Sequence, residues 1–178
     1  MASLQQEMRN MFDKHCSMDF NEKKLRLEDG LLEKIINLSF ANLRLYNIRP
    51  WKITAVKSPA LLQKLYKTVN DRRIIECAVA LIVIDDLQYG STSDMLMYEK
   101  ERDNDLQLLS MSIMYAAKYN FIDSILIKEF NKELVVREFA LDRKKPVAAI
   151  VCLGCFDNRK DIAPLFARHT YSDIVKEI

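Results

Sequence analysis

The chain has 178 residues, of which 49% are hydrophobic and 29% charged, as expected for one globular domain spanning residues 1–178. Its 27 basic and 25 acidic residues give a net charge of +2, which is too small to indicate a nucleic-acid-binding protein. Glycine-rich phosphate loops cannot form, because the only glycines are Gly30, Gly90 and Gly154. Two histidines cannot build a three-histidine zinc site, and we expect no metal. A bound phosphate would therefore need side chains or a helix N-terminus.

The sequence also predicts where the protein resides. The first residues contain no apolar segment behind a basic start, so we expect no secretory signal. The longest apolar run, 77–84, is far shorter than the roughly 20 residues that span a bilayer. We therefore expect a cytoplasmic protein without a membrane-spanning segment.

Apolar periodicity and turn residues predict helices and strands that interleave along the chain. In chain order we expect a helix over 1–15, a helix over 28–42, a strand over 51–56, a helix over 59–69 capped by Ser58, a strand over 78–84, a loop over 85–93, a helix over 94–121, a strand over 124–127, a helix over 132–139, a strand over 147–153 and an edge strand over 172–178. This order predicts helices around one sheet, in the α/β or α+β class.

The helix predicted over 94–121 is apolar around nearly its full circumference in its second half. Such a helix must be covered on all sides. A second copy of the chain would supply the missing cover, so we expect a homodimer. The alternative is a central helix in a monomer.

Cys152 and Cys155 form a C-x-x-C pair within a predicted buried strand. Positions three apart on a strand point to opposite faces, and no second pair completes a zinc site. We interpret both cysteines as small buried residues rather than a redox or metal pair.

Several polar and apolar segments, taken together, resemble the nitroreductase family of FMN-dependent oxidoreductases in order and spacing. They are Lys14-His15-Cys16-Ser17-Met18-Asp19-Phe20, Tyr46-Asn47-Ile48-Arg49-Pro50-Trp51 before a strand, Asn70-Asp71-Arg72-Arg73 before a small-residue strand, Leu126-Ile127-Lys128-Glu129-Phe130, the buried strand that ends at Gly154, and Arg168 in the tail. The resemblance implies an α+β nitroreductase-like fold. Its central mixed β-sheet would be flanked by helices, with a C-terminal segment extending onto the partner of an obligate homodimer.

The resemblance assigns phosphate and ribityl contacts to the N-terminal half and the tail. Lys14, His15 and Arg168 would supply cations and donors to the FMN phosphate, with Cys16 as a small group beside it. Asn47 and Arg49 would contact the ribityl chain and the ring. Singly, Lys14 and His15 could instead cap a helix, and Arg168 could be solvated.

The resemblance places the flavin ring against two further segments. Asn70 would hydrogen-bond the ring edge, and Arg73 would lie near N1 and O2, where a cation stabilises the reduced ring. Lys128 and Glu129 would present backbone N–H groups near N5. The alternative for Arg72 and Arg73 is that both are surface charges paired with Asp71 and Glu76.

This chain departs from the family pattern at several of these positions. Met18 stands where a second basic residue is expected, and Leu45 stands where the family has a small residue two positions before the loop asparagine. Arg44 and Tyr46 make that loop bulkier than usual. Arg49 replaces a glutamine, and Lys128-Glu129 replaces a Glu-Gly pair that allows close backbone approach.

The resemblance implies hydride transfer from NAD(P)H to FMN and on to a quinone, a nitroaromatic or another flavin. No protein residue is expected to be catalytic, because the cofactor carries the hydride. The alternative is a protein of the same fold that binds flavin or a related ligand without turnover, or that has lost the cofactor. A third reading is a plain interaction module.

Overall fold

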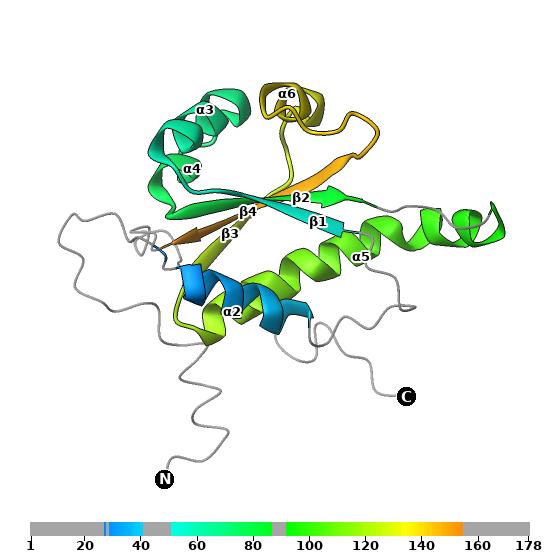
Figure 1. Ribbon diagram of the computed structural model, residues 1–178, viewed down its shortest axis with the longest axis horizontal. Coiled ribbons are helices and arrows are strands. Elements are labelled where there is room, and N and C mark those ends of the chain that lie inside the picture. The colour runs from blue at the N-terminus through cyan, green and yellow to red at the C-terminus, as the bar shows by residue number, and fades with distance from the viewer. Residues whose placement is uncertain (1–26, 28, 41–50, 87–91, 155–178) are drawn as a thin grey trace, which may run out of the picture.

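The computed structural model describes residues 27, 29–40, 51–86 and 92–154 of the chain. In these ranges helices and strands interleave as expected (Figure 1). The elements are α2 (Asp29–Phe40), β1 (Trp51–Val56), α3 (Pro59–Val69), α4 (Arg73–Glu76), β2 (Val79–Asp85), α5 (Thr92–Tyr119), β3 (Asp123–Ile127), α6 (Lys132–Glu138) and β4 (Val147–Gly154).

The described strands form one sheet in the order β1-β2-β4-β3. Every pairing among them is antiparallel, with Ile53 opposite Val83, Ile82 opposite Ile150, and Leu126 opposite Val151. The fold class is therefore α+β as expected, but the described sheet is antiparallel rather than mixed. The expected edge strand over 172–178 and the expected helix over 1–15 lie outside the described residues.

The two faces of the sheet are covered by different helices, which gives three layers (Figure 1). Because successive strand residues point to opposite faces, Leu81 and Val83 of β2 pack toward α2 and α5. Ala80 and Ile82 pack instead with apolar residues of α3, α4 and α6. All of β2 is buried as a result, which explains why its sequence is apolar without alternation.

Local sequence signals fix the ends of the short helices. Ser58 accepts a hydrogen bond from the backbone N–H of Leu61, and Pro59 occupies the first turn of α3. Asn131 caps α6 in the same way through the N–H of Leu134. Such a cap contributes about 1 kcal/mol to stability.

The structure corrects the predictions around β2. Helix α4 was not expected, because four residues are too few to show a helical period. Asp85, expected in a loop, instead ends β2, where it pairs with Trp51 and donates its N–H to Pro146. Helix α5 begins at Thr92, two residues before its expected start. Of the helices in the described ranges, none has the length and apolar character needed to cross a membrane.

Candidate functional site

The predicted ring-binding residues Asn70 and Arg73 flank the turn between α3 and α4. Asn70 ends α3 in the left-handed conformation, with φ of 59° and ψ of 37°, and its N–H bonds to the carbonyl of Tyr66 at 2.6 Å. Asparagine is one of the few residues that adopt this conformation readily. The turn it makes leads directly into Asp71 and α4.

Arg73 forms a two-point ion pair with Asp71. Its Nε lies 2.9 Å from Oδ1 and 3.1 Å from Oδ2, and its Nη2 lies 2.5 Å from Oδ2. The backbone N–H of Arg73 also donates to Asp71 Oδ1, at 3.0 Å. The hydrogen bonds from Arg73 hold the pKa of the Asp71 carboxyl below its usual range, and the same pair raises the pKa of Arg73.

The neighbouring Arg72 has a different environment. Its Nε lies 3.1 Å from Glu76 Oε1 one helical turn away, and its side chain is 82% exposed, against 43% for Arg73. Both arginines are therefore paired with the acids that the alternative interpretation named. Exposure and two-point geometry separate Arg73 from Arg72.

Two buried thiols lie on the sheet side of this turn. The Cys77 Sγ donates to the carbonyl of Ile74 at 3.1 Å, and the Cys77 thiol contacts that of Cys152 on β4. This contact and burial raise the pKa of Cys152 far above its ordinary value. Cys152 is thus buried, as predicted, while Cys155 lies outside the described residues.

The second predicted pair, Lys128 and Glu129, lies in the connection from β3 to α6. The Lys128 Nζ donates to Gln107 Oε1 of α5 at 3.1 Å. Within the described ranges, no hydrogen bond or ion pair joins this pair to Asn70 or Arg73. Asn70 and Arg73 thus lie at the turn between α3 and α4, whereas Lys128 and Glu129 lie in the connection that follows β3.

The remaining predicted site residues fall outside the described part of the chain. They are Lys14, His15, Cys16, Met18, Leu45, Asn47, Arg49 and Arg168. The residue that the predicted site omitted is Asp71. The signal for it was its spacing, because an aspartate two residues before an arginine can accept from both its backbone and its side chain.

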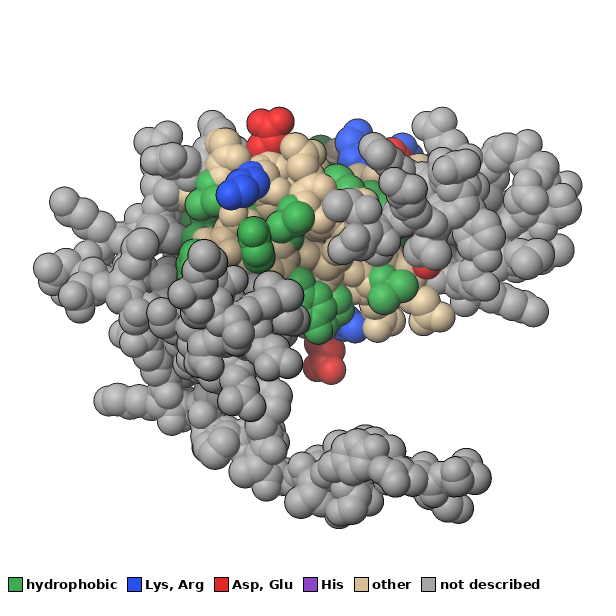
Figure 2. Space-filling view, turned by 90° about the horizontal axis from the view of Figure 1, so that it is seen from below, with side chains coloured by type: hydrophobic (Ala, Val, Ile, Leu, Met, Phe, Trp, Pro, Cys, Tyr) green, Lys and Arg blue, Asp and Glu red, His purple; other side chains and the backbone are tan. Residues whose placement is uncertain are grey.

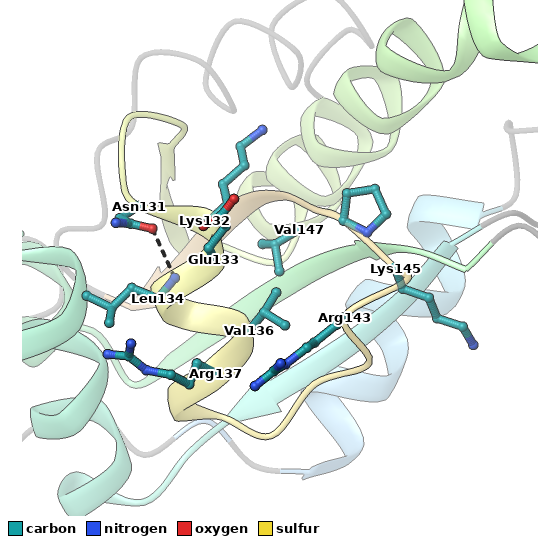
Figure 3. Close-up of a pocket in the computed structure, with 10 residues that line it drawn as sticks. Asn131, Lys132, Glu133, Leu134, Val136, Arg137, Arg143, Lys145 and Val147 are labelled. Carbon is teal, nitrogen blue, oxygen red and sulfur yellow. Dashed lines mark hydrogen bonds between the residues drawn. The ribbon is translucent and has the colours of Figure 1, made fainter.

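A pocket of about 580 Å³ lies between α6 and the loop before β4, and it contains none of the predicted site residues. Three of its charged side chains, Lys132, Arg137 and Lys145, extend in different directions (Figure 3). Lys145 pairs with Asp86, and Arg137 with Glu138. These three side chains therefore do not form a focused site for a charged group. No cluster of metal-ligating side chains occurs among the described residues either.

Helix α5 leaves an apolar face exposed. Leu109 and Ile113 are fully buried against the sheet, whereas Leu108, Met111 and Tyr115 are exposed, Tyr115 by 55%. Figure 2 looks onto the layer of α2 and α5 and shows hydrophobic side chains at its surface. Within the part of the chain that the structure describes, the sheet and α2 therefore cover the expected all-round apolar helix, and this face is left exposed.

Comparison with solved structures shows that the chain has the nitroreductase fold. A nitroreductase-like protein from Streptococcus mutans has 10% sequence identity and a TM-score of 0.76, covering 98% of this chain and 100% of that one. A nitroreductase family protein from Streptococcus pneumoniae has 13% identity and a TM-score of 0.73, covering 97% and 99%. An FMN-dependent nitroreductase from Clostridium difficile has 18% identity and a TM-score of 0.64, covering 78% and 82%. No protein-family model and no curated protein matches the sequence.

Proposed function

We propose that the protein is an FMN-dependent oxidoreductase that takes hydride from NAD(P)H and passes it to a quinone, a nitroaromatic or a similar acceptor. The observation that carries this proposal is the half-exposed, ion-paired Arg73 at the start of α4 in a chain of nitroreductase fold. The neighbour from Clostridium difficile is named as FMN-dependent, which supports FMN as the cofactor here.

The described residues fit a flavin ring. Asp71 contacts only one edge of the Arg73 guanidinium, so the other edge has N–H donors for an anionic acceptor such as ring N1 and O2. Bound FMN would supply the hydride acceptor and donor. Arg73 would place a fixed positive charge beside the ring, and Asn70, held by its left-handed backbone, would orient its amide toward the ring edge. Lys14, His15 and Arg168 would hold the phosphate, and Asn47 and Arg49 the ribityl chain.

The proposal includes a homodimer whose two copies together complete each site. The exposed apolar face of α5, with Leu108, Met111 and Tyr115, supports it, since such a surface marks an interaction site.

A second candidate is a flavin-binding protein without turnover. Glu129 favours it, because this residue stands where the family pattern has a glycine. A side chain at that position limits how closely the backbone can approach a ring.

The visible absorbance of the purified, desalted protein tests both candidates. The oxidoreductase predicts a flavin spectrum, at about one FMN per chain, that bleaches on anaerobic addition of NADH or NADPH. A flavin spectrum that neither NADH nor NADPH bleaches would contradict the oxidoreductase and support the second candidate. A colourless protein that fails to take up added FMN would refute both.

A further inference from the structure

The Asp71 carboxylate restrains Arg73 through both its guanidinium and its backbone N–H. It accepts from the guanidinium through Nε and Nη2, and its Oδ1 also accepts the Arg73 backbone N–H at 3.0 Å. The backbone bond fixes where the side chain starts, and the two-point ion pair fixes where it ends. Arg73 is therefore held in one orientation although 43% of its side chain is exposed.

This geometry leaves a defined set of donors. A guanidinium carries five N–H donors in a rigid plane, and Asp71 uses the Nε–H and one Nη2 hydrogen. Within the described ranges, Arg73 makes side-chain hydrogen bonds through this edge alone. The two Nη1 hydrogens and the second Nη2 hydrogen remain on the opposite side.

We propose that Asp71 is a positioning residue for Arg73. One edge of the guanidinium binds the Asp71 carboxylate, and the opposite edge then faces a bound anionic group. This assignment rests on the proposed function, in which that group is the N1 and O2 edge of FMN. Arginine can serve both partners at once, because its donors lie on two edges. Lysine cannot, because a single ammonium next to Asp71 pairs with the carboxylate.

The test is a double-mutant cycle of Asp71→Asn and Arg73→Lys. The flavin-free chain is titrated first with oxidised FMN. It is then titrated, without oxygen, with FMN that dithionite has reduced. The measured quantity is the ratio of the oxidised to the reduced dissociation constant. We expect Arg73→Lys to lower this ratio about tenfold, which for a two-electron couple is about 30 mV. Adding Asp71→Asn should restore most of the loss, because the lysine is then no longer paired with a carboxylate. Asp71→Asn alone should change the ratio less than threefold, because losing the pair that orients Arg73 lowers the ratio while losing a nearby negative charge raises it.

The adjacent ion pair provides the matched control. Glu76→Gln removes a carboxylate from the same short helix but acts on Arg72, so it should not rescue Arg73→Lys. An additive cycle, or equal rescue by Glu76→Gln, would overturn the role of Asp71 while leaving the proposed function intact. A wild-type chain that binds no FMN would overturn both.

A second measurement needs no cofactor and covers the case in which a variant fails to fold. In ¹⁵N NMR spectra of the flavin-free chain, the Arg73 Nε–H should exchange slowly with water, and that of Arg72 quickly. Asp71→Asn, or Asp71→Ser as a smaller replacement, should remove the protection of Arg73, and Glu76→Gln should not. Equal exchange of the two arginines in the wild type would overturn the assignment.

Discussion

A Cβ atom on Gly154, at the end of β4, would lie 3.0 Å from the backbone nitrogen of Ala78 and 3.2 Å from the Cα of Cys77. The Ala78 N–H also donates to the carbonyl of Leu153 at 2.9 Å, so this stretch of backbone cannot move away without loss of a ladder bond. Glycine at the end of the buried strand therefore lets β4 approach the junction of α4 and β2. This junction carries the Cys77 thiol, which contacts the thiol of Cys152 on β4.

We expect Gly154→Ala to destabilise the protein by about 1–3 kcal/mol through overpacking. The measurement is the free energy of unfolding in urea. Gly30→Ala is the matched control, because a Cβ there meets nothing within 4 Å and Gly30 lies in α2. That variant should stabilise the protein by about 0.5–1 kcal/mol. Equal effects of the two substitutions would contradict this account of Gly154.

The Cys77–Cys152 contact predicts both thiol reactivity and pH dependence. Because the pKa of Cys152 is raised in the folded protein, its thiol stays protonated at a pH where an unfolded cysteine, with a pKa of about 8.5, ionises. The unfolded state then binds fewer protons, so stability should be complete below about pH 8.5 and fall as pH rises above it.

Thermal unfolding between pH 7 and pH 10 measures this loss, and Cys152→Ala should reduce it. Alkylation followed by mass spectrometry supplies the second readout. Cys77 and Cys152 should react with iodoacetamide only after unfolding. Rapid labelling of either residue in the folded protein would show that the pair is accessible.

Much of the fold could be predicted from the sequence, because the elements carry local signals. Strand β1 has the predicted bounds, and β4 differs by one residue, since apolar runs between turn residues mark both strands. Strand pairing could not be predicted in this way. The neighbours of β4, for example, come from residues 79–84 and 123–127, and only long-range packing decides that these meet in antiparallel register.

The candidate site was predictable to a lesser degree. The spacing of the 70–73 segment was enough to suggest that Arg73 pairs with Asp71, because both lie in one turn. The position of Lys128 was not predictable. Its hydrogen bond partner, Gln107, lies in α5, 21 residues earlier in the chain, and only the tertiary structure brings the two side chains together. Short-range chemistry can be inferred from a motif, whereas the assembly of distant segments depends on the tertiary structure.

The two arginines at the start of α4, Arg72 and Arg73, should differ in function. If the proposed function holds, Arg73→Ala removes the cation beside the ring and should lower the rate of NAD(P)H oxidation about 100-fold or more, the usual cost of one such electrostatic donor. Arg72→Ala is the control, because this side chain is 82% exposed and pairs only with Glu76 among the described residues. It should change the rate less than twofold. Steady-state kinetics on the FMN-loaded protein measures both, and an unchanged rate for Arg73→Ala would remove Arg73 from the mechanism.

The exposed face of α5 predicts how the chain associates. Placing a charge in its centre, with Tyr115→Glu, should convert a dimer of about twice 20.8 kDa into monomers, because an unpaired carboxylate would be buried between the copies. Leu61→Glu is the matched control, since Leu61 is 46% exposed but lies on α3, across the sheet from α5. It should leave the mass unchanged. Light scattering coupled to gel filtration measures the mass of each variant. A wild-type mass of one chain would contradict the dimer, whereas a dimer that survives Tyr115→Glu would place the interface on another surface.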